Sequence, residues 1–299
     1  MPRVAIRFGL LTAALLLAAG CAAKSEPGPA TVPPGAGTSA GVSTDTAVAS
    51  KCTPQTLQTH SSGALTVATD SPAYEPWFKD DKPSNGKGFE SAVAYAVAKQ
   101  LGYSPSKVNW VKASFNTVVS PAPKNYDFDI NEVSITVRRA KVVDFSSGYY
   151  DVAQAVVALN SNKYAKATTV AGLKGAKLGA QQGTTSFDAI NDVIKPGPTP
   201  AEYPSNDLAV QALKNGTIDG LVVDLPTGLY ITAAQVPHSK IIGQLPVSGQ
   251  PEQFGLVLDK GSSLTPCVTQ AVDALRSDGT LKKLQQKWLT ASAGAPVLK

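Results

Sequence analysis

The sequence lacks the motifs and residue clusters on which many enzymes, metal sites and nucleic-acid-binding surfaces depend. Its two histidines, His60 and His238, lie far apart without companions at metal-ligand spacing, so both are expected at the surface. There is no GxSxG motif, no HExxH motif and no credible catalytic triad. No long lysine or arginine run accompanies the net charge of +5, so nucleic-acid binding is not expected.

Long apolar runs are also scarce, and the one at the N-terminus is too short to cross a membrane. Residues 8–19 are almost wholly apolar and follow a short basic stretch, whereas a spanning helix needs roughly 20 residues. This pattern indicates a secretory signal peptide over residues 1–20. The ending LAAGC resembles a lipoprotein lipobox, although Ala18 stands where leucine is usual. We therefore expect cleavage before Cys21 and a lipid such as palmitate on its thiol; ordinary secretion is the alternative.

The chain has only three cysteines, Cys21, Cys52 and Cys267. If Cys21 carries lipid, an even pair remains in an oxidising compartment, and Cys52 and Cys267 are expected to form one disulfide. Such a bond would close a very long loop and stabilise the fold by about 5 kcal/mol at most in the chain-entropy model. Two free thiols are the alternative.

Residues 22–50 are rich in alanine, glycine, proline, serine and threonine and show no apolar periodicity. Such a segment cannot bury enough surface to offset its ordering entropy, so residues 21–51 are expected to be a lipidated flexible tether. The remaining chain of about 245 residues suits one large domain or two lobes.

Strand and helix patterns alternate along this part of the chain, which is typical of an α/β fold. In the expected helix at 89–101, apolar residues recur every four positions, and Gly102 supplies its end. The other expected helices cover residues 187–194 and 206–213, a segment that starts at Thr265-Pro266, and a final stripe over 281–288. The expected strands cover residues 64–69, 127–130, 177–180 and 219–223.

Six stretches follow one another between residues 65 and 289: LTVATDSPAYEPWF, GFESAVAYAVAKQLGY, YDFDINEVSITVRRAKVVDFSSGYYD, LKGAKLGAQQGTTSFDAI, ALKNGTIDGLVVDLPTGLYI and LRSDGTLKKLQQKW. In their order and spacing they resemble the amino-acid-binding proteins of ABC importers, the family 3 extracellular solute-binding proteins.

The resemblance implies a two-lobed periplasmic-binding-protein-like (Venus flytrap) α/β fold, with the ligand clamped between the lobes. Two crossover strands are expected at residues 154–160 and 254–260. They divide the chain into lobe 1 (residues 52–155 plus 255–292), lobe 2 (156–254) and a tail (293–299). The expected disulfide would then lie within lobe 1. The implied function is capture of a free amino acid outside the cytoplasm, by a monomer without cofactor or metal, and its delivery to the permease subunits of an ABC importer.

A site for a free amino acid needs one element for each part of the ligand. For the carboxylate, Arg139 of SITVRR matches the family's arginine, and its planar fork can make two charge-assisted bonds. The turn before the expected helix at 187–194 offers backbone N–H groups, and Thr185 is the expected donor there. For the ammonium group, the resemblance implies Asp224, assisted by the hydroxyl of Ser134 and the carbonyl of Glu132.

The ligand side chain is expected to meet Asp70, Tyr74, Phe115 and Glu132. Tyr74 and Phe115 match positions that enclose the aliphatic part of the ligand. Glu132 occupies a place that is often glycine in the family. Because Asp70 and Glu132 add acidic groups to a cleft that already holds Asp224, a cationic or amide side chain is favoured, as in arginine, lysine, ornithine or glutamine.

Two other functions use the same fold. A dehydratase-like enzyme would need a general acid, for which Glu132 is the candidate. A sensor that reports its ligand to a membrane signalling protein would have an identical binding site, so residues alone do not separate it from a transport protein.

Overall fold

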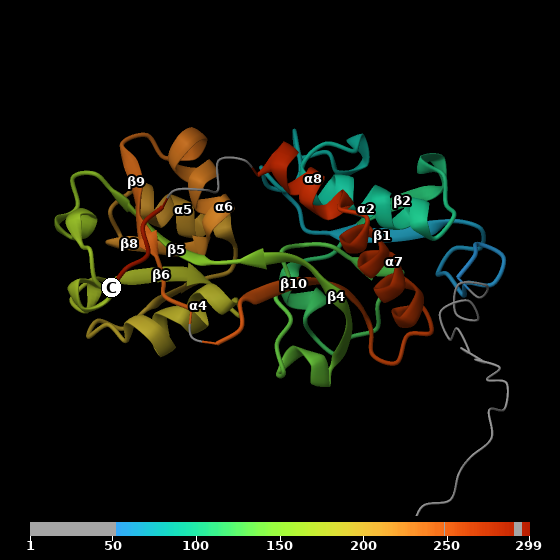
Figure 1. Cartoon of the computed structure of the whole chain (residues 1–299). Coiled ribbons are helices and arrows are strands. Elements are labelled where there is room, and N and C mark those ends of the chain that lie inside the picture. Colours follow the sequence, from blue (N-terminus) through green and yellow to red (C-terminus); the bar gives the residue numbers. More distant parts are fainter. Residues whose placement is uncertain (1–51, 248, 290–294) are drawn as a thin grey trace, which may run out of the picture. The chain divides into compact units, whose positions relative to one another are not determined.

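The computed structural model describes residues 52–247, 249–289 and 295–299, which form two five-stranded sheets with helices packed on them (Figure 1). Cys21 and the expected tether lie outside the described residues. Within the part of the chain that is described, no helix is both long and apolar enough to span a membrane.

The first sheet has the order β2-β1-β3-β10-β4. Its β1 is parallel to β2 and β3, while β10 runs antiparallel to β3 and β4. The strands are Leu65–Thr69 (β1), Val108–Lys112 (β2), Phe128–Asp129 (β3), Val143–Val152 (β4) and Glu252–Asp259 (β10). The helices of this lobe are Phe89–Gln100 (α2), Phe115–Val118 (α3), Thr265–Ser277 (α7) and Thr280–Trp288 (α8), and its 3₁₀ turns are Pro83–Asn85, Pro105–Lys107 and Arg139–Lys141.

Helix α2 shows how the sequence builds the core of this lobe. Its buried stripe, with Phe89, Val93 and Val97 fully covered, packs in the same apolar cluster as Leu65 of β1. The helix starts directly after Gly88, which has φ 93°, and a Cβ at Gly88 would lie 2.4 Å from the carbonyl oxygen of Trp77. Only glycine allows this close approach.

The second sheet has the order β7-β6-β8-β5-β9, with β6 parallel to β7 and β8 and β5 antiparallel to β8 and β9. The strands are Gln154–Leu159 (β5), Leu178–Gln181 (β6), Ala201–Tyr203 (β7), Gly220–Asp224 (β8) and Ser239–Gln244 (β9). The helices are Thr185–Ala189 (α4), Asn206–Lys214 (α5) and Leu225–Tyr230 (α6); π-helical turns, Ile190–Ile194 and Ile231–Gln235, continue α4 and α6, and 3₁₀ turns are Lys163–Lys166 and Ala171–Leu173.

The chain passes between the sheets at two places next to each other. It leaves the first sheet at Val152, the end of β4, and enters the second at Gln154, the start of β5. It leaves the second sheet at Gln244, the end of β9, and re-enters the first at Glu252, which pairs with Val152. We call these two passages the hinge.

The C-terminal residues 295–299 add to the second sheet. Val297 forms a parallel bridge with Gln244, and Gln244 exchanges backbone hydrogen bonds with Pro296 and Leu298. Leu298 is buried in the apolar cluster of this lobe. A Cβ at Gly243 would lie 2.8 Å from the Leu298 side chain, so glycine makes room for the docked segment.

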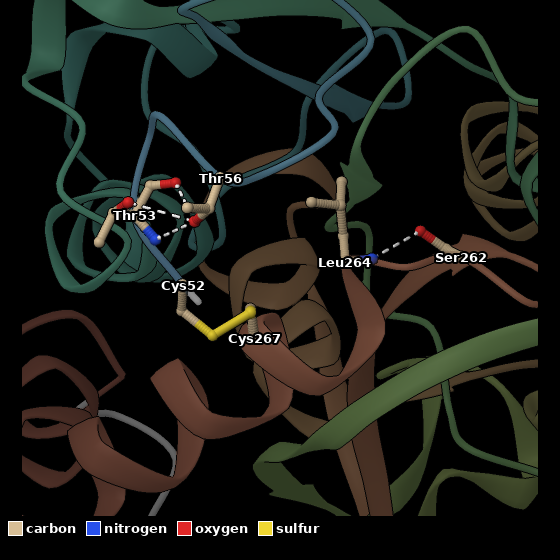
Figure 2. Close-up of a disulfide and its surroundings, with 6 residues drawn as sticks. All are labelled: Cys52, Thr53, Thr56, Ser262, Leu264 and Cys267. Carbon is tan, nitrogen blue, oxygen red and sulfur yellow. Dashed lines mark hydrogen bonds between the residues drawn. A yellow bond between two sulfur atoms is a disulfide. The ribbon is translucent and has the colours of Figure 1, made fainter. Parts of the chain in front are cut away.

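Cys52 and Cys267 form a disulfide, as the cysteine count predicts (Figure 2). Cys267 lies in α7, and both cysteines pack with the apolar cluster of the first lobe. The bond joins residues 215 positions apart in sequence and stays within one lobe.

Candidate ligand-binding site

All eight residues that the sequence analysis assigns to a ligand line one pocket, to which both lobes contribute. The lining residues are Asp70, Tyr74, Phe115, Asn131, Glu132, Ser134, Arg139, Gln181, Thr184, Thr185, Ser186, Asn206 and Asp224. Thr184 belongs to the turn that is expected to offer backbone N–H groups to the carboxylate. No ligand role was expected for the uncharged polar residues Asn131, Gln181, Ser186 and Asn206.

Arg139 places a buried cation at this pocket. It begins the 3₁₀ turn Arg139–Lys141 and is 4% exposed. Its Nη1 donates to the carbonyl of Ser134 at 2.7 Å, and its Nη2 donates across to the carbonyl of Gly183 in the second lobe at 3.0 Å. Burial lowers its pKa to about 10, against the opposing charge of Glu252. Its guanidinium carbon lies 5.1 Å from the ring centre of Phe115.

The neighbouring arginine has a different environment. Arg138 is exposed and pairs with the exposed Asp188 at 3.0 Å. By contrast, the Nε of Arg139 is buried and has no hydrogen-bond partner among the described residues. One donor of the buried guanidinium is therefore unused among the described residues.

Asp224 stands at the end of β8, directly before α6. Gln154, the first residue of β5, donates from its Nε2 to Asp224 Oδ1 at 2.8 Å. Burial raises the Asp224 pKa well above its usual value, the nearby charge of Glu252 raises it further, and the Gln154 bond opposes the rise. A cationic group beside Asp224 would favour the ionised form.

Glu132 has a left-handed backbone, with φ 53°. The backbone N–H of Glu132 donates to the carboxylate of Glu90, in α2, at 2.7 Å. Oε2 of Glu132 accepts from the Thr227 hydroxyl of the second lobe at 2.9 Å, and that hydroxyl accepts from Trp77 Nε1 at 2.8 Å. Burial, followed by the charges of Glu90 and Asp224, raises the Glu132 pKa well above its usual value.

Asp70, Tyr74 and Phe115 form the part of the wall that β1 and α3 position. Asp70 follows β1 and accepts from the backbone N–H groups of Ser71 at 2.7 Å and Phe115 at 3.4 Å. Burial raises the Asp70 pKa despite these bonds. The Tyr74 pKa is also raised, chiefly by burial and then by the charges of Asp207 and Asp70.

The hydroxyl groups of Ser134 and Thr185, two residues assigned to the ligand, face each other across the lobes. Ser134 Oγ and Thr185 Oγ1 are 3.2 Å apart. Both hydroxyl groups donate to Oε1 of Glu252, and the distance from Thr185 Oγ1 to this oxygen is 2.5 Å. Glu252 was absent from the sequence analysis, because a single acid in the turn QPEQ matches no binding motif.

The walls of the pocket lie close together. The space open to water inside it is about 30 Å³, which admits only a few water molecules. Among the described residues, no cluster of three or more His, Cys, Asp or Glu side chains has the geometry to hold a metal ion.

Two α/β lobes that share a hinge, with a polar pocket formed by both, define a two-lobed solute-binding protein of the periplasmic type. The model of the bacterial extracellular solute-binding proteins, family 3, matches residues 65–291, so the chain belongs to that family.

Its relatives are amino-acid-binding components of transporters. The ABC transporter glutamine-binding protein GlnH of Bacillus subtilis (strain 168) is 28% identical over 212 residues, which are 69% of this chain and 75% of that protein. The L-cystine-binding protein TcyJ of Escherichia coli (strain K12) is 29% identical over 238 residues, 77% of this chain and 84% of that protein. Among solved structures, an ancestral arginine-binding protein bound to glutamine is 32% identical with a TM-score of 0.63, and the match covers 75% of this chain and 97% of that one.

Proposed function

We propose that this protein binds a polar amino acid with a cationic or amide side chain between its lobes and delivers it to an ABC importer. The observation that carries the proposal is the charge arrangement of one pocket, where a buried arginine, Arg139, and a half-buried aspartate, Asp224, line the same small space. This arrangement complements the carboxylate and the ammonium group of a free amino acid.

In this proposal Arg139 binds the ligand carboxylate, assisted by the backbone N–H of Thr185. Asp224 binds the ammonium group, with the Ser134 hydroxyl and the Glu132 carbonyl completing its shell. Since Gln154 already orients the Asp224 carboxylate, the acceptor is held in place before the ligand arrives.

The surplus of acids supports the proposed preference for the side chain. Besides Asp224, the pocket is lined by Asp70 and Glu132, while Arg139 is the one Lys or Arg residue in its described lining. A glutamate ligand would bring a second carboxylate towards these acids, whereas arginine, lysine, ornithine or glutamine would bring donors. Tyr74 and Phe115 would cover the aliphatic part of such a side chain.

Hinge closure couples binding to recognition by the importer. Because the space in the pocket is about 30 Å³, the lobes must separate to admit an amino acid and close again on it. Lobe 1 contributes Arg139 and Ser134, and lobe 2 contributes Thr185 and Asp224. Only the closed form satisfies both charged ends of the ligand, so binding shifts the population towards it.

A thermal-shift panel tests the proposal. The twenty amino acids, ornithine and citrulline would be added singly to protein freed of endogenous ligand by unfolding and refolding. Binding to the folded state raises the melting temperature by mass action. We expect the largest shifts for cationic or amide amino acids. Tighter binding of glutamate than of arginine and glutamine would refute the side-chain preference, and no shift with any amino acid would refute the function.

We further propose that lipid on Cys21 anchors a monomer to the outer face of the cell membrane. Mass spectrometry of the purified protein would show a diacylated N-terminal cysteine, and Cys21→Ser would release the protein from the membrane. Recovery of wild-type protein from the medium without lipid would contradict the anchor.

The alternative functions are separated by two further measurements. Uptake of the bound amino acid that requires both this protein and a permease supports transport, whereas an unchanged uptake with a lost transcriptional response supports sensing. Turnover of a bound candidate, absent in Glu132→Gln, would support a dehydratase-like enzyme, for which Glu132 is the acid in question.

A further inference from the structure

Glu252 is an acidic residue at the hinge that has no role in the proposed function. It is the first residue of β10 and pairs with Val152, the last residue of β4. Its carboxylate therefore originates from the hinge, at the point where the chain re-enters the first sheet. It lies outside the pocket lining and lines, with Gln154 and Thr185, an adjacent hollow on the hinge.

The Glu252 carboxylate connects side chains from both lobes. Its Oε1 accepts hydrogen bonds from Ser134 Oγ of the first lobe and from Thr185 Oγ1 of the second, the latter at 2.5 Å. Its Oε2 accepts a longer bond, 3.2 Å, from Nε2 of Gln154. One carboxylate thus holds together the two hydroxyl groups that face the pocket from opposite lobes.

These bonds decide what the hydroxyl groups can offer a ligand. A serine or threonine hydroxyl has one hydrogen to donate and two lone pairs to accept with. In this structure both hydrogens point to Glu252, so Ser134 and Thr185 present only acceptors to the pocket. An acceptor suits the ammonium group of an amino acid but cannot bind its carboxylate, which is left to Arg139 and the backbone N–H of Thr185.

We infer that Glu252 is a positioning residue that makes recognition of the ligand's α-ammonium group strict, by taking the hydroxyl hydrogens of Ser134 and Thr185. This inference rests on the proposed function. Without Glu252, the two hydroxyl groups can rotate and donate to a carboxylate. A ligand that lacks the ammonium group then loses less affinity, relative to the amino acid, than it does in the wild type. A negative charge behind the hydroxyl groups adds to the same preference.

Two matched pairs of probes test the inference. L-arginine is compared with 5-guanidinopentanoate, and L-glutamine with glutaramate; the second member of each pair lacks only the α-amino group. Calorimetry gives the ratio of dissociation constants within each pair. We expect Glu252→Ala to lower this ratio at least tenfold, and Glu252→Gln, whose amide oxygen still accepts from both hydroxyl groups, to keep it within about threefold of wild type.

The control is Gln253→Ala, which changes the next residue of β10. The side chain of Gln253 donates to Asp151 and contacts neither hydroxyl group. The ratio of dissociation constants in Gln253→Ala is therefore expected to match that of the wild type. If Glu252→Ala weakens all four probes by the same factor, Glu252 has a structural role only and the inference is wrong.

A measurement without ligand separates failure of this inference from failure of the proposed function. If wild type binds no amino acid, the proposed function fails, but the link between the lobes can still be measured by small-angle X-ray scattering. Glu252→Ala is expected to increase the radius of gyration of the ligand-free protein, while Glu252→Gln and Gln253→Ala leave it unchanged. Identical scattering from wild type and Glu252→Ala would overturn the bridging role.

Discussion

At the scale of single residues, Arg138 and Arg139 show how one position along the chain changes the role of a side chain. Arg138 is exposed and pairs with Asp188 at the surface, whereas Arg139 is 4% exposed and has a buried Nε without a partner in the described residues. Exposed ion pairs contribute at most about 1 kcal/mol. A buried charge pair contributes more, because its loss leaves the partner uncompensated.

We therefore predict that Arg139→Ala weakens amino-acid binding at least about 100-fold, since truncating one partner of a buried charge pair costs about 3 kcal/mol. The matched control is Arg138→Ala, for which we expect a change below about threefold. Calorimetry with L-arginine and L-glutamine measures both, and circular dichroism checks that each variant is folded. Equal losses in the two variants would contradict the assignment of the carboxylate site to Arg139.

Glu132 combines an unfavourable backbone with a side chain in the pocket. A left-handed conformation costs an L-residue about 1–2 kcal/mol, and Glu132 has a φ of 53°. Strained residues of this kind tend to lie at functional sites.

We predict that Glu132→Gly is more stable than Glu132→Ala by about 1 kcal/mol, because only glycine removes the backbone strain. Both variants lack the carboxylate, so both should lose the preference for arginine over glutamate to a similar degree. Urea unfolding and calorimetry check the two halves separately. A preference that persists in both variants would exclude Glu132 from side-chain recognition.

The charged residues of the pocket could be predicted from the sequence, but Glu252 could not. Arg139 and Asp224 stand in stretches that match a family, whereas Glu252 acts through side chains from two other segments, Ser134 and Thr185. Such a contact depends on how the hinge brings these segments together, and no local pattern contains that information.

At the scale of elements, apolar periodicity located helices and strands better than it located their ends. The expected helix at 89–101 is observed as Phe89–Gln100, and the expected strand at 219–223 as Gly220–Asp224. The expected helix at 187–194 starts earlier, at Thr185, because the hydroxyl of Thr184 accepts from the N–H of Phe187 and caps it. Capping choices among adjacent threonines are local and leave no trace in apolar periodicity.

The C-terminal segment had no helix or strand pattern, and its docking on β9 depends on tertiary contacts. Leu298 is 2% exposed and Val297 is 58% exposed, although they are neighbours. We predict that Leu298→Ala lowers the free energy of unfolding by about 2 kcal/mol or more, as expected for a buried leucine. Val297→Ala is the control, with an effect below about 0.5 kcal/mol. Urea unfolding followed by circular dichroism measures both, and similar effects would show that the segment is not docked in solution.

At the scale of the whole molecule, the acids around the cleft link ligand binding to pH. Burial raises the pKa of Glu90 to about 7, although the Tyr149 hydroxyl and the Glu132 N–H oppose the shift. Burial also raises the pKa values of Glu132 and Asp224 well above their usual range. The folded protein therefore keeps protons that the unfolded chain has already released at the same pH.

The sign of the pH dependence follows from that difference. Unfolded glutamate has a pKa of about 4.3, so this contribution to stability is full below about pH 4 and is lost as pH rises through the folded value near 7. For Glu90 alone the loss amounts to about 4 kcal/mol by pH 8. We predict that the free energy of unfolding of ligand-free protein falls over this range, and that it falls less in Glu90→Gln.

Urea unfolding at intervals between pH 4.5 and 8 measures this dependence, with Glu202→Gln on the exposed face of β7 as the control that keeps the wild-type slope. If the free energy of unfolding falls equally with pH in wild type and in Glu90→Gln, Glu90 is not the cause of the fall. A cationic ligand should reduce the fall, because its positive charges favour the ionised acids that line the pocket. The acids that line the pocket would then destabilise the ligand-free protein at neutral pH and stabilise its complex with a cationic amino acid. The same charges would favour both closure of the lobes on the ligand and selection of a cationic ligand.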